Sequence, residues 1–127
     1  MGCASSNQSK IVCIPYRTED KGLEVVVVKK GGGWFFPKGH CQSGETNEDA
    51  VTRIMNEKAG VAGDIGQELL LDRPNVHVFP VSNVRMIRNW PEGKRKWLIS
   101  ARAQTEVGQD YVRDPLIQLR NRLEQNY

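Results

Sequence analysis

The chain has 127 residues, of which 26% are charged, and its formal net charge is +3 at pH 7. This length suits one domain that buries its own core, and the charge is too small to indicate nucleic-acid binding by itself. No apolar run approaches the roughly 18 residues of a membrane span, and the start lacks the apolar core of a signal peptide. Three cysteines without Cys-x-x-Cys spacing support neither a disulfide framework nor a zinc site, so a reducing, intracellular setting is the simplest interpretation.

The first six residues, MGCASS, match the pattern for N-myristoylation. Gly2 would become terminal after removal of Met1, and Cys3 beside it is well placed for S-palmitoylation. Two acyl chains anchor a protein stably, whereas one binds membranes only marginally. We therefore expect residues 1–10 to be an acylated flexible segment that holds the chain on the cytoplasmic face of a membrane. The alternative is a polar start with an accidental match and a cytoplasmic protein.

Two apolar stretches, residues 11–17 and 23–30, predict the first two strands, with a polar turn at 18–22 between them. The second stretch contains four consecutive valines, which is typical of a fully buried strand. Three glycines at 31–33 follow it. They lack the Gly-Lys-Ser/Thr ending of a phosphate loop and precede a strand, so we interpret them as a flexible connection.

The most informative stretch covers residues 34–61, WFFPKGHCQSGETNEDAVTRIMNEKAGV. It predicts an apolar strand, a glycine-containing loop and one amphipathic helix. Thr46 is the expected N-cap, because Asp49 three residues later gives a pattern like a capping box, and Gly60 stands where a left-handed C-terminal residue belongs. Apolar residues recur between them at helical spacing: Ala50, Val51, Ile54, Met55 and Ala59.

This stretch resembles a Nudix box, whose family pattern is G-x5-E-x7-R-E-U-x-E-E-x-G-U, where U is a bulky aliphatic residue. The spacing fits without a gap. The matching positions, in order, are Gly39, Glu45, Arg53, Met55, Glu57, Gly60 and Val61. Two positions depart from the pattern, because Ile54 replaces the glutamate after the arginine and Lys58 replaces the second glutamate of the pair.

The resemblance implies an α/β fold for residues 11–127. It would be a Nudix-type α/β/α sandwich with a mixed central sheet, the box helix on one side and the C-terminal helix on the other. In the family, box carboxylates hold Mg²⁺ or Mn²⁺, which bridges the substrate oxygens and activates a water. The implied substrates are nucleoside or inositol diphosphates linked to another group. The segment WPEGKRKWL is similar to one in the diphosphoinositol polyphosphate phosphohydrolase branch.

The two departures remove charge from the helix. Three glutamates at the family spacing would lie on one helix face and converge on one metal cluster, whereas Ile, Glu and Lys give that triplet a net charge of zero. The candidate catalytic residues are Glu57, Glu45 and Arg53, and the two glutamates are also the candidate metal ligands. Arg53 is expected to pair with Glu45, and Glu106 is a further candidate outside the box. Lys58 either meets a phosphate directly or is a solvated lysine near the C-terminal end of the helix dipole.

Beyond the box, the sequence predicts more strands and a final helix. The strands are expected at residues 65–71, at 76–87 and from 94 toward 103. Pro80 inside the second of these argues for an edge strand or a bulge. Asp114 followed by Pro115 marks a helix start, and leucines continue at helical spacing to residue 123, so this helix should pack across the sheet.

A basic segment accompanies these strands, and its members are Arg85, Arg88, Lys94, Arg95 and Lys96. Together with Lys38 and Lys58, they are candidate ligand-binding groups, because guanidinium and ammonium groups bind phosphates through charge-assisted hydrogen bonds. The alternatives are lysines that protect an edge strand, or a patch that lies against anionic lipid. No nucleic-acid partner is expected, because the aromatic platforms of a recognisable RNA-binding module are missing.

Three functions remain open. The favoured one is a membrane-anchored Nudix-fold protein that binds a nucleoside or inositol polyphosphate, with weak or lost metal-dependent hydrolysis and no required cofactor. The first alternative is an active Nudix pyrophosphohydrolase with Mg²⁺ or Mn²⁺ on Glu57 and Glu45. The second is a non-catalytic scaffold for a protein partner. Restoring carboxylates by Ile54→Glu with Lys58→Glu is expected to raise the affinity for Mg²⁺.

Overall fold

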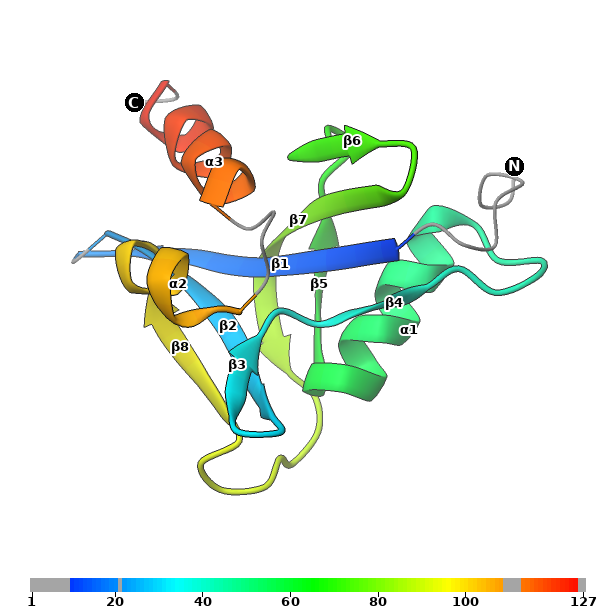
Figure 1. The fold of residues 1–127 in the computed structure, drawn as a ribbon, viewed down its shortest axis with the longest axis horizontal. Helices are drawn as coiled ribbons and strands as arrows, with labels where there is room; N and C mark the ends of the chain where they lie inside the picture. The colour runs from blue at the N-terminus through cyan, green and yellow to red at the C-terminus, as the bar shows by residue number, and fades with distance from the viewer. Residues whose placement is uncertain (1–9, 21, 109–112, 126–127) are drawn as a thin grey trace.

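A computed structural model describes residues 10–20, 22–108 and 113–125 (Figure 1). Gly2 and Cys3 therefore lie outside the described residues. The elements, in chain order, are β1 (Lys10–Glu19), β2 (Gly22–Lys30), β3 (Gly33–Phe35), β4 (Lys38–His40), α1 (Asn47–Ala59), β5 (Val61–Ile65), β6 (Leu71–Arg73), β7 (Val76–Met86), β8 (Arg95–Ile99), α2 (Ser100–Glu106) and α3 (Arg113–Gln125). Within these residues, no helix is long and apolar enough to cross a bilayer.

The sheet is mixed and is built around β1. This strand runs parallel to β7 and antiparallel to β2 and β4, with its first residues on β4 and its last residues on β2. β3 and β8 pair with β2, and β5 and β6 pair with β7, all antiparallel. The short strand β4 thus joins the sheet beside the start of β1, just before the chain enters the loop to α1.

Alternation along β1 divides the core into two layers. Val12 and Ile14 belong to one buried cluster, which includes residues of α2 and α3, whereas Ile11 and Cys13 belong to the other, which includes the apolar face of α1. Because successive strand residues point to opposite faces, α1 covers one face of the sheet and α3 the other. The expected α/β/α sandwich with a mixed sheet is confirmed.

Helix α1 has both of the predicted end signals. The Thr46 side chain accepts a hydrogen bond from the Asp49 backbone nitrogen at 3.0 Å, and the Asp49 carboxylate accepts one from the Thr46 nitrogen at 3.3 Å. Gly60 ends the helix in the left-handed conformation, with φ of 65°. The five apolar residues expected on the inner face are all buried. This helix therefore begins and ends where the sequence predicts.

The predicted strand at 65–71 is wrong. The strand after α1 is β5, which starts directly after Gly60, and the next one, β6, has only three residues. Ala62 and Gly63 in β5 are small and carry little apolar signal, which explains the error. The strand expected from 94 toward 103 ends at Ile99 and is followed by α2, whose inner face is marked by the buried residues Ser100 and Ala103.

Pro80 does not lie in an edge strand, because β7 has partners on both sides. Its carbonyl accepts a hydrogen bond from the Gly66 nitrogen at 2.8 Å, just beyond the end of β5. The N–H and C=O of one strand residue point the same way, so the missing N–H of Pro80 removes no bond between β7 and β1. Among the described cysteines, Cys13 is a buried free thiol.

Candidate functional site

The loop before α1 is tied to the helix by Arg53. Its Nε donates to one carboxylate oxygen of Glu45 at 2.7 Å, and its Nη2 donates to the other at 3.0 Å and to the His40 carbonyl at 2.8 Å. The Gln42 backbone nitrogen also donates to Glu45, at 2.8 Å. This two-pronged pairing of guanidinium and carboxylate is the strongest form of charge-assisted hydrogen bond, and it joins the helix to the end of β4.

These contacts perturb both charged groups. The Arg53 side chain, followed by the Gln42 backbone N–H, lowers the pKa of Glu45, and the hydrogen bond from Glu45 raises the pKa of Arg53. Both oxygens of Glu45 are therefore engaged by protein donors. The predicted pairing of Arg53 with Glu45 is present, and it leaves Glu45 poorly suited to hold a metal ion.

Ile54 occupies the family position of a metal-binding glutamate, but it is fully buried in the α1 side of the core. A Cβ added to Gly39 would come within 3.0 Å of the Ile54 Cγ1 atom, so strand β4 and helix α1 are in direct contact there. Ile54 therefore belongs to the packing between helix and sheet and does not line the cavity described next.

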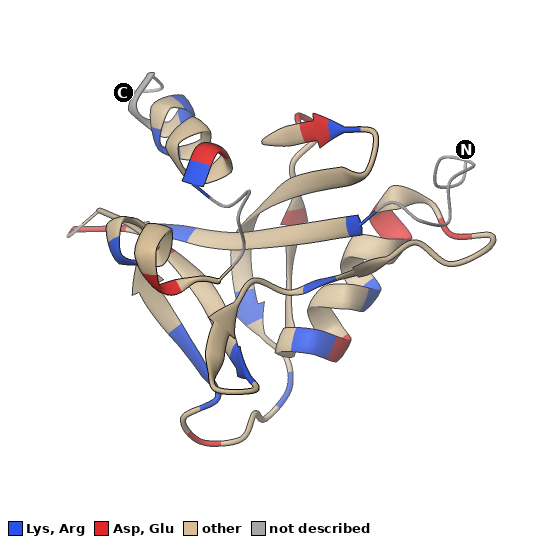
Figure 2. Cartoon of the chain, viewed as in Figure 1, with Lys and Arg blue, Asp and Glu red and all other residues tan. Residues whose placement is uncertain are grey.

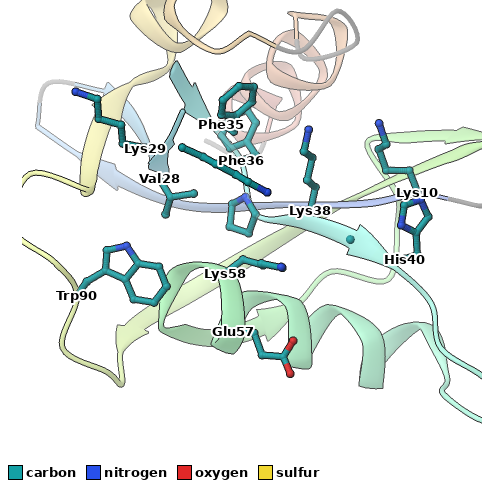
Figure 3. A pocket seen from close by; sticks show the side chains of 13 residues that line it. Lys10, Val28, Lys29, Phe35, Phe36, Lys38, His40, Glu57, Lys58 and Trp90 are labelled. Atoms are coloured by element: carbon teal, nitrogen blue, oxygen red, sulfur yellow. The ribbon is translucent and has the colours of Figure 1, made fainter. Parts of the chain in front are cut away.

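A cavity of about 560 Å³ lies between the C-terminal part of α1 and the strands β1, β2 and β4 (Figure 3). Its lining residues are Lys10, Val28, Lys29, Lys30, Phe35, Phe36, Pro37, Lys38, Gly39, His40, Glu57, Lys58 and Trp90. Among them, five are lysines and one, Glu57, is a glutamate. We call this the lysine cavity. Figure 2 shows basic positions of α1, β2 and β8 at the same end of the sheet.

The electrostatics of the lysine cavity favour an anion. Burial, followed by the charges of Lys10 and Lys30, lowers the pKa of Lys38. The Lys38 ammonium also lies 5.0 Å from the centre of the Phe35 ring. A lowered lysine pKa means that the local surroundings disfavour a further positive charge. A phosphate group placed beside Lys38 would favour its charged form against both the burial and the neighbouring lysines.

The basic segment predicted to bind ligand lies elsewhere. None of its five members, Arg85, Arg88, Lys94, Arg95 and Lys96, lines the lysine cavity. Arg95 donates to the Ala59 carbonyl at the end of α1, at 2.8 Å, and Lys96 lies over the Trp34 ring at 4.2 Å. Two other predicted ligand-binding residues, Lys38 and Lys58, line the cavity. Three further lining lysines, Lys10, Lys29 and Lys30, were not predicted, because they stand at strand ends and meet only through strand pairing.

The donor set does not fit a resident divalent ion. Mg²⁺ demands octahedral coordination by oxygen atoms and is usually held by one or two carboxylates together with waters and substrate phosphates. No group of three or more histidine, cysteine, aspartate or glutamate side chains that could hold a metal occurs in the part of the chain that the structure describes. Glu57 lies 3.5 Å from Arg53, and Glu106, the candidate outside the box, pairs with Arg102 on α2 at 3.0 Å.

The NUDIX domain model matches residues 7–109. The chain belongs to the Nudix family. This Nudix domain is 30% identical to Arabidopsis thaliana Nudix hydrolase 21, chloroplastic, in an alignment that covers 87% of the chain and 65% of the relative. It is also 30% identical to Nudix hydrolase 4 of the same plant over 121 residues, which cover 78% of the chain and 58% of the relative. The chain thus spans less than two thirds of the length of these relatives.

Solved structures agree on the fold. A NUDIX hydrolase from Listeria monocytogenes superposes with a TM-score of 0.68 at 14% identity, covering 93% of this chain and 95% of that one. The C. elegans Ap4A hydrolase superposes with a TM-score of 0.65 at 17% identity, and the match covers 93% of this chain and 99% of that one. Nudix hydrolases generally use divalent ions such as Mg²⁺ or Mn²⁺, and the family binds or hydrolyses pyrophosphate-containing compounds.

Proposed function

We propose that this Nudix domain binds a diphosphate-containing ligand, a nucleoside or inositol polyphosphate, in the lysine cavity, with weak or lost metal-dependent hydrolysis. The observation that carries the proposal is the composition of that cavity, in which five lysines accompany one glutamate among the described lining residues. Lys58 belongs to this set and stands where the family pattern has a metal-binding glutamate. The Lys58 ammonium group therefore stands where the family has a carboxylate that binds a divalent cation.

The physical basis is a change of counter-charge. A diphosphate needs positive charge close to its oxygens, and lysine ammonium groups provide it as mobile point charges with several hydrogen-bond donors each. The lowered pKa of Lys38 supports the proposal, because burial and then the charges of Lys10 and Lys30 disfavour its ammonium form, and an anion beside it would favour that form. Binding of this kind needs no metal, and added salt weakens it through screening of the exposed charges.

Calorimetry in the presence of a chelator tests the proposal. Tripolyphosphate, ATP and inositol hexakisphosphate are titrated at low and moderate salt, and phosphate release is measured on the same samples after Mg²⁺ is added. We expect binding that persists in chelator and weakens as salt rises, with little or no phosphate release. No binding at low salt would refute the phosphate site and favour the protein-interaction scaffold.

A matched pair of variants locates the site. Lys58→Glu and Lys94→Glu change the net charge by the same amount, but only Lys58 lines the cavity, whereas Lys94 is exposed on the loop between β7 and β8. We expect Lys58→Glu to weaken binding by roughly tenfold or more, because it replaces an attraction at contact distance with a repulsion. Lys94→Glu should change affinity by less than about twofold, as long-range charge effects are screened. Equal losses would contradict a site at Lys58.

Active hydrolysis remains the second candidate, since the family membership supports it equally and Glu57 lies in the cavity with Arg53 beside it. This candidate requires turnover that depends on Mg²⁺ or Mn²⁺ and disappears in Glu57→Gln. Robust turnover of that kind by the natural sequence would replace the binding proposal.

We further propose that the chain is held on the cytoplasmic face of a membrane by acylation of Gly2 and Cys3. The support is the MGCASS start, with two adjacent acylation signals. In a cell able to acylate the chain, Gly2→Ala should shift it from the membrane fraction to the soluble fraction. An unchanged distribution of Gly2→Ala would remove the anchor.

A further inference from the structure

One wall of the lysine cavity is aromatic and lies on the loop between β7 and β8. Trp90 lines the cavity and is partly buried against the α1 side of the core. In the view of Figure 3, Trp90 is at one side of the cavity and Lys10 and His40 are at the other, with Lys38 and Lys58 between them. The cavity thus has an aromatic end and a strongly basic remainder.

The loop that carries Trp90 is fixed to the end of α1. The Gly60 carbonyl accepts hydrogen bonds from the backbone nitrogens of Ile87, at 3.0 Å, and Arg88, at 3.2 Å. Because Gly60 has no side chain, the indole sits directly against it, and a Cβ there would be 2.9 Å from the Trp90 ring. The distance between Trp90 and Lys58, two residues before Gly60, is therefore set by backbone contacts.

Arg95 reinforces this arrangement from β8. One Nη1 atom donates to the Ala59 carbonyl at 2.8 Å and to the Arg88 carbonyl at 3.3 Å, while the guanidinium carbon lies 5.6 Å from the centre of the Trp90 ring. A planar guanidinium near an aromatic face adds a cation–π attraction. Arg95 therefore joins the end of the helix, the loop and the indole without itself lining the cavity.

We propose that Trp90 is a specificity-determining residue that contacts a planar aromatic group attached to the phosphates of the ligand, and that Arg95 is the residue that positions it. The proposal rests on the proposed function and narrows it. A ligand made of phosphates alone would satisfy the lysines and leave the partly exposed Trp90 and Phe35 rings in contact with water. A ligand with an aromatic group would cover these apolar surfaces as well, and stacking of one base on an aromatic side chain strengthens binding by roughly tenfold.

ATP and inorganic tripolyphosphate make the critical comparison, because both carry a triphosphate chain and tripolyphosphate has at least as much negative charge. In chelator and at low salt, we expect ATP to bind about tenfold more tightly than tripolyphosphate. Trp90→Ala should remove this preference by weakening ATP about tenfold and tripolyphosphate less than about twofold. Trp90→Phe should retain most of the preference. Ile87→Ala, which trims an exposed side chain of the same loop, is the control and should change neither affinity.

Arg95 needs a readout that a general loss of stability would not give. Arg95→Ala should produce the same selective loss of ATP affinity as Trp90→Ala, together with a change in the near-ultraviolet circular dichroism of the indole. Arg95→Lys can still donate to the helix carbonyls, so it should recover part of the ATP affinity and part of the circular dichroism signal of the indole. Selective loss in the alanine variants supports the proposal.

The outcomes separate this inference from the proposed function. If tripolyphosphate binds as tightly as ATP, or if Trp90→Ala weakens both ligands equally, the aromatic wall is refuted while the phosphate site stands. If neither ligand binds the natural protein, both proposals fail.

Discussion

The Nudix box has two parts that differ in this protein. The loop side consists of Glu45 and Arg53, and the metal side consists of positions 54, 57 and 58. On the loop side, Glu45 and Arg53 form a two-pronged ion pair, and Arg53 also binds the His40 carbonyl. On the metal side, Ile54 is buried in the core and Lys58 faces a cavity that contains four further lysines. The loop side thus has the contacts that the family pattern implies, whereas the metal side keeps one glutamate, Glu57, of the three in that pattern.

The difference shows that the box performs two separable tasks. The Arg53 hydrogen bonds hold the loop and β4 against α1, and they involve no atom of residue 54 or residue 58. The absence of a glutamate at positions 54 and 58 therefore leaves the architecture in place. Conversely, Ile54 strengthens the packing between helix and sheet, so the departure at this position contributes to stability.

The largest effect is expected from Ile54→Glu. The new carboxylate would be placed in a fully buried apolar site, against Gly39 and the α1 side of the core. Burying an ionised group without a partner is strongly unfavourable, so the free energy of unfolding should fall by at least about 3 kcal/mol. Chemical denaturation measures this loss. The same burial argues against using Ile54→Glu to restore a metal site.

Ile54→Val is the matched control and should cost only about 1 kcal/mol, as expected for loss of one buried methylene. If Ile54→Glu unfolds at the same denaturant concentration as the natural protein, residue 54 can reach water or the cavity. The contrast between the two sides of the box would then be smaller than the structure indicates.

The second effect concerns the loop side and depends on pH. Glu45 has a folded-state pKa below its ordinary value of 4.5, so its contribution to stability is complete above that value and disappears as pH falls through the folded pKa. Glu45→Gln should therefore lower the melting temperature by several degrees at pH 7. At a pH below the folded pKa of Glu45, the two proteins should melt together.

Thermal unfolding of both proteins across this pH range measures the effect, and Glu92→Gln, which removes an exposed loop carboxylate, is the control. The control should melt with the natural protein at every pH. If the difference in melting temperature between Glu45→Gln and the natural protein persists in acid, then the packing of the Glu45 side chain, and not its charge, is what stabilises the fold.

The sequence predicted the parts that depend on local signals. The side chain of Thr46 caps the start of α1, and Gly60, which has no side chain, ends the helix in the left-handed conformation. The inner face of the helix follows from the spacing of apolar residues. The pairing of Arg53 with Glu45 followed from the resemblance. Each of these features lies within one continuous stretch of the chain.

The lysine cavity could not be predicted in the same way. Lys10, Lys30 and Lys38 stand on three different strands, and they meet because β1 pairs with β4 while β2 lies alongside. Nearness in the sequence instead favoured the run from Arg85 to Lys96. In that run, Arg95 turned out to bind the carbonyls at the end of α1. Charge density along the chain therefore did not reveal which cations share a site.

The smallest effect is a gain of metal binding on the metal side. Lys58→Glu places a second carboxylate next to Glu57 in the C-terminal part of α1. The cavity would then hold four lysines and two adjacent glutamates. Mg²⁺ can be held by one or two carboxylates with water completing its shell, so we expect weak binding that calorimetry detects only at millimolar Mg²⁺. Lys58→Gln removes the same positive charge without adding a carboxylate, and it should show no such binding.

If Lys58→Gln gains as much affinity for Mg²⁺ as Lys58→Glu does, then repulsion by Lys58 alone kept the ion away. If the natural protein already binds Mg²⁺ tightly, Glu57 has oxygen partners beyond those described, and the metal side is not degenerate.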